Sequence, residues 1–419
     1  MLPSLEFDLE AYAISPRNGF LPGSPPLQRL TDPYYKPWEA IVGKLPELLR
    51  SGQLVAEVYK LPVLETSNLK DEREWRRAYS VLGFLTHAFI WGAASPSEVL
   101  PVPIARPFID VANHLGLPPT ATYAGLNLWN WSAQPGSSLS DPATLSVIQT
   151  LTGTDDESWF YLISVSMEAV GARTVPSMLQ AIEAARKNDH WKVVHGLNSM
   201  RFCIQELGLL LERMYERCDP AVFYHQIRPL LAGSKGMAAA GLPRGVFYSE
   251  GDGKGQWREY SGGSNAQSSL IQFLDVVLGV QHYSAGGVSK ESYIQDMRNY
   301  MPGPHRRFLQ NLTRTTNIRE YALNPTTDPT VLAAYNATVE ALAAFRDIHI
   351  RLVTRYIIAP SRKPARPQDA NMTNLATISH VKDEEKTTEP HVLYGTGGTA
   401  LIPFLKRTRD ETKAAASEG

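Results

Sequence analysis

The stretch EALAAFRDIHIRLVTRYII, from Glu340 to Ile358, decides how the second half of the chain folds and raises a question about one histidine. Its apolar residues recur with the spacing of a single buried helical face: Leu342, Phe345, Leu352, Val353 and Tyr356. His349 falls on the same face, where an apolar side chain is expected. Because burying an unpartnered polar ring costs roughly 1 to 3 kcal/mol, its nitrogens need a partner. A carbonyl, a carboxylate or a metal ion would each serve.

Length, charge and cysteine usage limit the classes of function. The chain has 419 residues, 43% of them hydrophobic, which is enough for a full core in two or three domains of ~100 to 200 residues each. A formal net charge of -1 without long Lys/Arg runs argues against a nucleic-acid partner. Cys203 and Cys218 form no CxxC pair, so neither a disulfide scaffold nor a structural zinc site is expected. The ligand is therefore expected to be small.

The N-terminal and apolar segments bear on localisation. Residues 1–27 carry acids and prolines where a signal peptide needs a basic start and an apolar core, which predicts a cytoplasmic protein. The two cysteines also fit a reducing compartment. The longest apolar stretch, VLGFLTHAFIWGAA at 81–94, is interrupted by His87 and is shorter than the ~20 residues that span a bilayer. No membrane segment is expected.

The pattern along the chain predicts a mainly α protein with two parts. Residues 1–150 hold many prolines and turn clusters between helices at 38–52 and 71–92, which indicates a small irregular domain. Residues 151–419 show long helical periods and hardly any alternation, so an all-helical large domain is expected. Within it, the proline-rich segment 359–394 predicts a mobile loop that ends in the turn GTGGT at 395–399. That turn lacks the lysine of a P-loop, so no nucleotide is expected.

Polar residues gather around two of the predicted helices. Ser264 follows a glycine pair and precedes Gln267 by three residues, the spacing of a capping box at a helix beginning near Gln267. In that helix Asp275 lies on or beside the apolar stripe, and a buried carboxylate needs a cation. Arg346 is one turn before His349 and could supply it. An ordinary structural ion pair is the alternative interpretation.

Several long stretches resemble the indoleamine 2,3-dioxygenase family, in the same order and with similar gaps. They are FYLISVSMEA (160–169), FYHQIRPLLAGSKG (223–236), YSGGSNAQSSLIQFLDVVLGVQ (260–281), YIQDMRNYMPGPHRRFL (293–309), the His349 helix and GTGGTALIPFLKRTR (395–409). The first ~100 residues match more loosely. The resemblance implies a mainly helical protein that binds haem b, with a smaller N-terminal domain over the distal side and the segment 359–399 as a lid.

The resemblance also implies roles for individual residues. His349 would be the proximal ligand of the haem iron, and Arg346 with Asp275 would brace that side of the cofactor. Arg228 would clamp the substrate carboxylate, since a guanidinium presents two parallel donors, and Ser164 would form a hydrogen bond rather than abstract a proton. The distal and substrate-binding positions are Tyr123, Phe160, Ser164, Phe223, Arg228, Gly263, Ser264 and Thr396.

Some positions depart from the family's pattern. Tyr224 stands where a second phenylalanine is usual, and Asn265 follows the Gly-Gly-Ser in place of a small residue. Leu126 and Asn127 also differ from the expected inner lining of the pocket. These changes bear on the selectivity among indoles rather than on the iron ligand.

The implied reaction inserts both atoms of dioxygen across the indole 2,3 bond of L-tryptophan or a related indoleamine, giving N-formylkynurenine. It is the first step of the kynurenine pathway, which serves NAD biosynthesis or tryptophan clearance. Dioxygen and an electron donor that keeps the iron ferrous are the further partners, and a monomer is expected. The alternative is a haem protein of the same fold that binds or senses dioxygen, but such a protein has no use for Arg228. A helical scaffold without cofactor would leave His349 unexplained.

Overall fold

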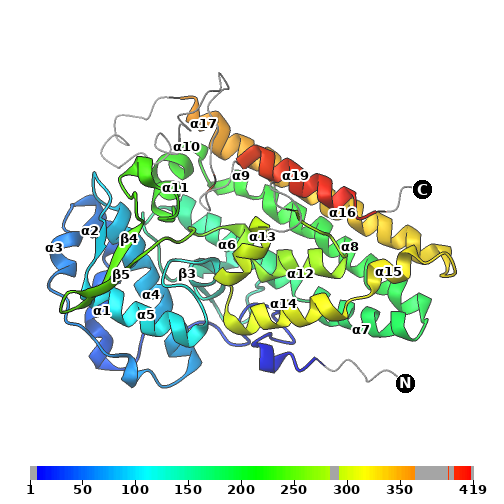
Figure 1. The fold of residues 1–419 in the computed structure, drawn as a ribbon, viewed down its shortest axis with the longest axis horizontal. Helices are drawn as coiled ribbons and strands as arrows, with labels where there is room; N and C mark the ends of the chain where they lie inside the picture. Colours follow the sequence, from blue (N-terminus) through cyan, green and yellow to red (C-terminus); the bar gives the residue numbers. More distant parts are fainter. Residues whose placement is uncertain (1–6, 284–291, 364–394, 396–400, 417–419) are drawn as a thin grey trace.

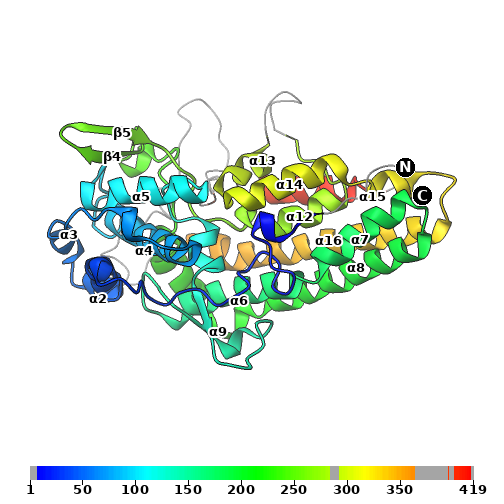
Figure 2. The same cartoon turned by 90° about the horizontal axis from the view of Figure 1, so that it is seen from below.

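The structure is a computed structural model that describes residues 7–283, 292–363, 395 and 401–416. The N-terminal helices and the strands lie at one end of an elongated molecule, and long helices of the second half run toward the other end (Figures 1 and 2). The elements of the first part are η1 (Glu10–Tyr12), η2 (Pro33–Tyr35), α1 (Lys36–Val42), α2 (Leu45–Arg50), α3 (Leu54–Val58), η3 (Thr66–Asn68), α4 (Glu72–Trp91), β1 (Val99–Leu100), α5 (Val102–Leu115), η4 (Ala124–Leu128), β2 (Trp131–Ala133), η5 (Pro142–Thr144) and β3 (Leu145–Val147).

From residue 155 the chain is dominated by helices, which confirms the mainly α fold. The elements are α6 (Asp155–Gly171), α7 (Thr174–Arg186), α8 (His190–Glu212), α9 (Met214–Arg217), α10 (Pro220–Val222), η6 (Phe223–Ile227), α11 (Arg228–Leu230), η7 (Ala238–Ala240), β4 (Val246–Gly251), β5 (Lys254–Arg258), η8 (Asn265–Gln267), α12 (Ser269–Val277), α13 (Tyr293–Asp296), η9 (Met297–Tyr300), α14 (Gly303–Thr315), α15 (Ile318–Leu323), α16 (Pro329–Val353), η10 (Thr354–Ile358), α17 (Ala359–Ser361) and α19 (Leu401–Lys413).

Helix α16, which carries His349, lies at the centre of the large part. It packs along α8 on one side, and α19 lies against it on another. Figure 2 shows α16 between α12 and α14 on one side and α6 and α8 on the other. The helix begins where Asp328 accepts a hydrogen bond from the amide of Thr330 and Pro329 occupies the first turn, both of which favour a helix start. It ends by widening into the π turn η10.

One pair of strands departs from the expectation of helices alone after residue 151. Strands β4 and β5 form an antiparallel hairpin, and β4 also pairs in parallel with β1 of the first part. Asp252 and Gly253 connect the two strands, and both have positive φ angles. Asp-Gly is the residue pair that tight hairpin turns favour, so the sequence carried a local signal for this hairpin. In Figure 1 the hairpin lies among the N-terminal elements.

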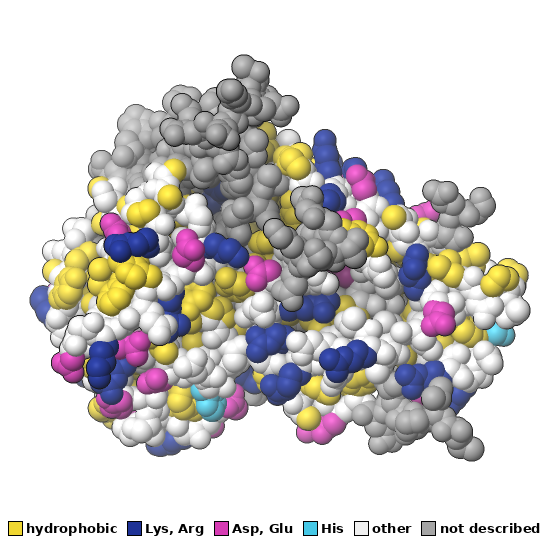
Figure 3. All heavy atoms as spheres, viewed as in Figure 1, with side chains coloured by type: hydrophobic (Ala, Val, Ile, Leu, Met, Phe, Trp, Pro, Cys, Tyr) yellow, Lys and Arg dark blue, Asp and Glu magenta, His cyan; other side chains and the backbone are white. Residues whose placement is uncertain are grey.

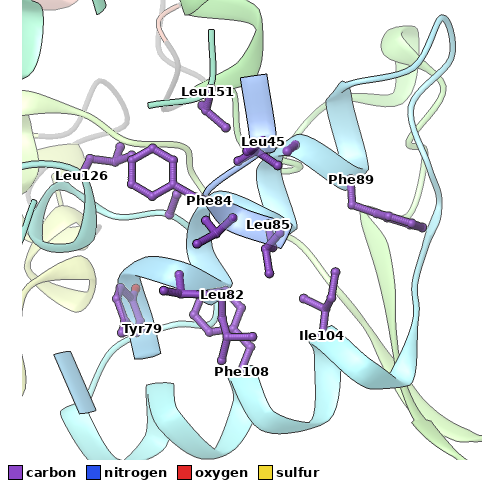
Figure 4. Close-up of a cluster of buried hydrophobic side chains, with 14 of the residues drawn as sticks. Leu45, Tyr79, Leu82, Phe84, Leu85, Phe89, Ile104, Phe108, Leu126 and Leu151 are labelled. Carbon is purple, nitrogen blue, oxygen red and sulfur yellow. The ribbon is translucent and has the colours of Figure 1, made fainter. Parts of the chain in front are cut away.

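The buried apolar side chains form two large clusters. The first joins α1 to α5 with η4, part of α6 and strand β4, and Figure 4 shows its centre around Leu82, Phe84 and Phe108. The second joins α7, α8, α12, α14 and α16, together with Ile14 and Phe20 from the start of the chain. We propose two domains, each built around one of these clusters. Strands β4 and β5 belong with the N-terminal domain, because β4 contributes to the first cluster and pairs with β5.

Three further features concern the ends and the surface of the chain. Helix α17 continues the helix to Ser361, slightly beyond residue 359, where the loop is predicted to begin.

Acidic and basic side chains are both spread over the face of the molecule in Figure 3. Among the helices of the described residues, none combines the length and apolar character needed to cross a bilayer.

Candidate active site

A cavity with two adjoining lobes lies between α6, α16 and α19. His349, Tyr123 and Phe160 line both lobes. Their empty volumes, mouths included, are about 1020 and 1040 Å³, at the upper end for small-molecule sites. The first lobe is mainly apolar and also holds Ser164 and Arg346. The second lobe also holds Asn127, Phe223, Arg228, Gly263 and Ser264.

His349 presents an unused imidazole to this cavity. Within the described residues, no group forms a hydrogen bond with its ring, while Phe345 and Leu352 of the same helix line the cavity beside it. Burial lowers the pKa of His349 to about 4, and the nearby Arg346 contributes to the shift. The ring is therefore neutral near pH 7 and keeps a lone pair available to a metal ion.

Asp275 and Arg346 form the predicted ion pair and join α12 to α16. The Nη2 atom of Arg346 donates to both carboxylate oxygens of Asp275 at 2.7 Å, and both side chains are buried. The Nη1 atom of Arg346 donates to the hydroxyl of Thr412. Burial acts to raise the pKa of Asp275, but Arg346 and His282 outweigh burial and hold that pKa below its ordinary value.

His282 and Glu411 extend this ion pair to the C-terminal helix α19, which sequence reasoning did not foresee. The Nε2 atom of His282 lies 3.1 Å from the carboxylate of Asp275, and its Nδ1 atom lies 2.7 Å from that of Glu411. Burial acts to lower the pKa of His282, but Asp275 and Glu411 raise it above its ordinary value. The imidazole thus connects two carboxylates that favour its cationic form, and α19 is fixed to the helix pair that carries His349.

Glu168 is a second buried group that the sequence did not mark. It lines the first lobe and is 1% exposed. Its Oε1 atom accepts hydrogen bonds from the hydroxyls of Tyr123 at 3.0 Å and Ser268 at 2.7 Å. Burial raises the pKa of Glu168 to about 7 against the opposing effect of those two hydrogen bonds. Burial and the neighbouring Glu168 also raise the pKa of Tyr123 well above its ordinary value, so the phenol remains protonated.

Three π turns supply residues to the second lobe. They are η4, which bears Leu126 and Asn127, η6, which begins at Phe223, and η10, which bears Tyr356. A π turn shifts the side chains that follow it around the helix axis and is common at functional sites. The rings of Phe160 and Phe223 meet edge to face with centroids 5.0 Å apart. This pair forms an apolar wall suited to contact with an aromatic ligand.

Arg228 lies just beyond η6, in the wall of the second lobe. Its side chain is 5% exposed, and its guanidinium carbon is 5.7 Å from the ring centroid of Tyr224. Burial lowers the pKa of Arg228, and Tyr224 partly offsets this. A buried cation in the wall of a cavity can bind an anionic ligand strongly, because water does not screen the contact.

The Gly-Gly-Ser turn lies in the same lobe but caps its helix differently from the prediction. A Cβ atom at Gly263 would lie 2.5 Å from Leu126 Cδ1, so a side chain there would crowd a residue that also lines this lobe. Ser264 accepts a hydrogen bond from the amide of Ala266, and Ser268 caps α12 instead. The predicted capping box is wrong because the side chain of Gln267 is buried and used elsewhere. Its Oε1 atom accepts a hydrogen bond from the amide of Tyr123, and its Nε2 atom donates to the carbonyl of Gly262.

The cavity brings together most residues that the resemblance suggested. Asp275 lies behind the wall and reaches the cavity through Arg346. Thr396 and most of the predicted lid lie outside the described residues, while Gly395 lines the second lobe. The residues that line the cavity are Tyr123, Phe160, Ser164, Phe223, Arg228, Gly263, Ser264, Arg346 and His349.

The cavity suits a planar cofactor that brings its own metal ligands. Within the described residues no group of three or more His, Cys, Asp or Glu side chains could hold a metal ion. A single neutral histidine facing an apolar lobe instead matches haem, whose porphyrin nitrogens supply the other ligands. The fold and the cavity therefore define a mainly helical protein with an enclosed, largely apolar cavity that a neutral histidine lines.

Comparison with known proteins gives the family. A model of the indoleamine 2,3-dioxygenase family matches residues 8–415. The chain is 44% identical to indoleamine 2,3-dioxygenase of Saccharomyces cerevisiae over 97% of its own length and 93% of the relative's. The chain belongs to the indoleamine 2,3-dioxygenase family.

More distant relatives match along nearly the full chain as well. The 6-hydroxytryptophan 2,3-dioxygenase of Fusarium equiseti is 38% identical over 98% of both chains. Indoleamine 2,3-dioxygenase 2 of Homo sapiens is 36% identical over 98% of this chain and 95% of the relative. The similarity includes the looser N-terminal part.

Proposed function

We propose that this protein is a haem-dependent dioxygenase that inserts dioxygen across the indole 2,3 bond of L-tryptophan or a related indoleamine, giving N-formylkynurenine. The membership of the family and the names of its relatives support the reaction. One relative is named for a tryptophan with a ring hydroxyl, so hydroxylated indoles belong to the substrate class. The observation that carries the haem assignment is the unused, neutral imidazole of His349 on an apolar cavity.

Haem b, when bound through His349, supplies the chemistry that activates dioxygen. The chain's own residues bind and orient the substrate. Arg228 binds the substrate carboxylate, and the edge-to-face pair of Phe160 and Phe223 packs against the indole. Ser164 offers a hydroxyl as hydrogen-bond partner at the boundary of the first lobe. Holding the indole in one orientation in a dry site accounts for much of the rate that a protein can add.

The remaining side chains support these contacts. Arg346 and Asp275 hold the helix that carries His349, and Tyr123 is fixed by Glu168. Gly263 and Ser264 bring the backbone close to the second lobe. We further propose that the segment 359–399 is a lid over the site.

The alternative function is a haem protein of this fold that only binds or senses dioxygen. The comparisons do not favour it, since the relatives are named as dioxygenases. Arg228 also argues against it, because a buried cation facing a cavity serves an anionic substrate and has no role in carrying dioxygen.

We propose a cytoplasmic monomer that acts at the first step of the kynurenine pathway, toward NAD biosynthesis or tryptophan clearance, with an electron donor that keeps the iron ferrous. The cysteines Cys203 and Cys218 are both free and buried, in keeping with a reducing compartment.

The function is tested by loading the purified protein with haem, reducing it and supplying L-tryptophan and dioxygen over a range of concentrations. We expect a haem absorption band and saturable formation of N-formylkynurenine. Reversible binding of dioxygen without product at any tryptophan concentration would favour the carrier, and a chain that takes up no haem would exclude both.

A further inference from the structure

A second cavity lies between the N-terminal part of the molecule and the long helices. Residues of α4 and α5, of the first turns of α14 and of the segment 10–22 line it. Its volume, mouth included, is about 1070 Å³, and none of its lining residues lines either lobe of the candidate active site. Gly116 at the end of α5 meets Gly303 at the start of α14 in its wall, since a Cβ atom at Gly116 would lie 3.0 Å from Gly303 Cα. This cavity is therefore a separate feature of the fold.

Two arginines of α14 line this cavity, and their contacts place both guanidinium groups beside its wall. The Nη1 atom of Arg306 donates to the carbonyl of Gly116 at 3.4 Å. The Nη1 atom of Arg307 lies 3.5 Å from the position of a Cβ atom at Gly303. Within the described residues, neither guanidinium forms an ion pair with a carboxylate. Figure 3 shows basic side chains along α14.

Arg76 of α4 brings a third guanidinium to the cavity from the N-terminal part. Its guanidinium carbon lies 5.7 Å from the ring centroid of Trp129, which also lines the cavity. Burial, and then the charge of Arg76, lower the pKa of the lining residue His305 to about 3. Burial also lowers the pKa of Arg76 against the opposing charge of Glu72, and the Nε atom of Arg76 has no hydrogen-bond partner within the described residues. A half-buried cation of this kind favours an anion as its partner.

Two carboxylates line the same cavity, but both belong to exposed residues. A carboxylate oxygen of Glu72 lies 2.5 Å from the Nε2 atom of His114, so this carboxylate already has a partner. Glu10 belongs to the short helix η1. Because water and salt screen exposed charges, these two carboxylates offset little of the field of the half-buried Arg76 and Arg306. The cavity therefore keeps an excess of positive charge.

We propose that this cavity binds a small organic polyanion, a molecule that carries a phosphate group or at least two carboxylates. Guanidinium groups bind phosphate and carboxylate through two parallel hydrogen bonds. A single negative charge would neutralise one of three cations, so multiply charged ligands bind best. The volume is at the upper end for small-molecule sites and accommodates an organic molecule. Because such a ligand contacts both α4 and α14, its binding stabilises the packing of the two parts of the molecule.

The test titrates the purified full chain with pyrophosphate, citrate or acetate in a chloride buffer of constant ionic strength. Isothermal titration calorimetry gives the affinity and the stoichiometry, and a thermal scan gives the melting temperature. We expect one pyrophosphate or one citrate to bind per chain and to raise the melting temperature, and acetate to bind at least about tenfold more weakly. Binding of pyrophosphate alone would assign the site to phosphate esters, and binding of citrate alone would assign it to polycarboxylates.

Variants that each remove one cation test the site itself. Arg76→Gln and Arg306→Gln should each weaken binding at least about tenfold. Arg307→Gln changes an exposed residue, so it should fold even if the other two variants do not, and it should weaken binding about threefold. Arg314→Gln, at an exposed arginine of α14 that does not line the cavity, is the matched control and should bind like the wild type.

Two results would overturn the inference. One is a wild type that binds neither pyrophosphate nor citrate more tightly than acetate. The other is binding that is unchanged in every folded cavity variant, or that Arg314→Gln weakens as much as Arg307→Gln does, since the effect would then come from surface charge in general. The assay needs neither haem nor tryptophan, so its result does not depend on the proposed function.

Discussion

The ring contacts of the half-buried His349 differ from those of the fully buried His87 and His305. His87 uses both ring nitrogens, with the carbonyl of Leu230 and the hydroxyl of Thr120, and His305 contacts Ser269 and a backbone carbonyl. Burial lowers the pKa of His87 to about 4 and that of His305 to about 3. A low pKa is thus shared by all three, and within the described residues only the ring of His349 among them forms no hydrogen bond. The buried His225 also leaves its Nδ1 atom without a partner there, but it does not line the cavity, so we propose His349 as the ligand.

We predict that His349→Gly abolishes stable haem binding while the chain stays largely helical, and that added imidazole restores the haem band by taking the place of the lost ring. Absorbance spectra and circular dichroism measure both. His195→Ala, a change at an exposed histidine of α8, is the control and should retain haem. Full haem occupancy in His349→Gly without imidazole would contradict the assignment.

We predict that Arg228→Ala keeps haem and dioxygen binding but raises KM for tryptophan about thirtyfold or more. A charge-assisted contact in a dry site is worth roughly 2 to 5 kcal/mol, and ~1.4 kcal/mol is a factor of ten. Arg228→Lys should recover only part of the loss, because an ammonium cannot offer two parallel donors.

Steady-state kinetics measure the Arg228 effect, and indole analogues without a carboxylate provide the control. They should bind the wild type and Arg228→Ala equally, which separates a lost carboxylate contact from a collapsed pocket. An unaltered concentration dependence for tryptophan in Arg228→Ala would show that another group orients the substrate.

The carboxyl of Glu168 should make stability depend on pH. Its pKa is raised from 4.5 to about 7, so between those values the unfolded chain releases a proton that the folded chain keeps. The stabilisation that the protonated carboxyl gives the folded chain is fully present below pH 4.5 and is lost as pH rises to about 7. This loss lowers the free energy of unfolding by roughly 3 kcal/mol.

We therefore predict that Glu168→Gln, which cannot ionise, loses less stability than the wild type when the pH rises from about 5 to about 8. Urea unfolding at a series of pH values measures the free energy of unfolding. Glu340→Gln, at an exposed position of α16, should follow the wild type. Parallel curves for the wild type and Glu168→Gln would mean that Glu168 does not titrate in this range.

At the scale of elements, a line of polar contacts joins α12, α16 and α19 behind the cavity. Arg346 of α16 bonds Asp275 of α12 and Thr412 of α19, and His282 connects Asp275 to Glu411 of α19. Helix α19 also places Phe404 and Leu405 in the cavity wall. The position of that wall therefore depends on the same contacts that hold the His349 helix.

We predict that Asp275→Asn and Arg346→Met each speed the release of haem and destabilise the fold by about 3 to 5 kcal/mol, because Asp275→Asn leaves the buried guanidinium without its carboxylate and Arg346→Met leaves Asp275 with His282 alone. The double variant should cost less than the sum of the two. Transfer of haem to a scavenging protein and urea unfolding measure these effects. Glu212→Gln breaks an exposed pair with Arg351 and should change little. Equal haem release in all of these variants would contradict a bracing role.

At the scale of the whole molecule, features with a local or periodic signal could be predicted from the sequence. The helix that carries His349 follows from its apolar period, and Asp275 and Arg346 were paired because a buried carboxylate needs a cation. The β4–β5 hairpin was missed although Asp252 and Gly253 mark its turn. Its strands are short, and β4 also pairs with β1, which is far away in the sequence.

The rest of the candidate site depends on contacts between distant segments. His282 meets Glu411 across 129 positions and Glu168 meets Ser268 across 100, and no local pattern announces either contact. The π turns are similarly hard to predict, because only short helices or none follow them, so too few residues show the changed phase of the apolar pattern.

The central claim, that this protein is a haem-dependent dioxygenase of tryptophan, is tested most directly by turnover under isotopically labelled dioxygen. The reduced, haem-loaded chain is incubated with L-tryptophan and ¹⁸O₂ in ordinary water, and the product is analysed at once by mass spectrometry. We predict N-formylkynurenine in which both inserted oxygen atoms carry the label. Product with one labelled atom or none, or no product although dioxygen binds reversibly, would contradict the claim.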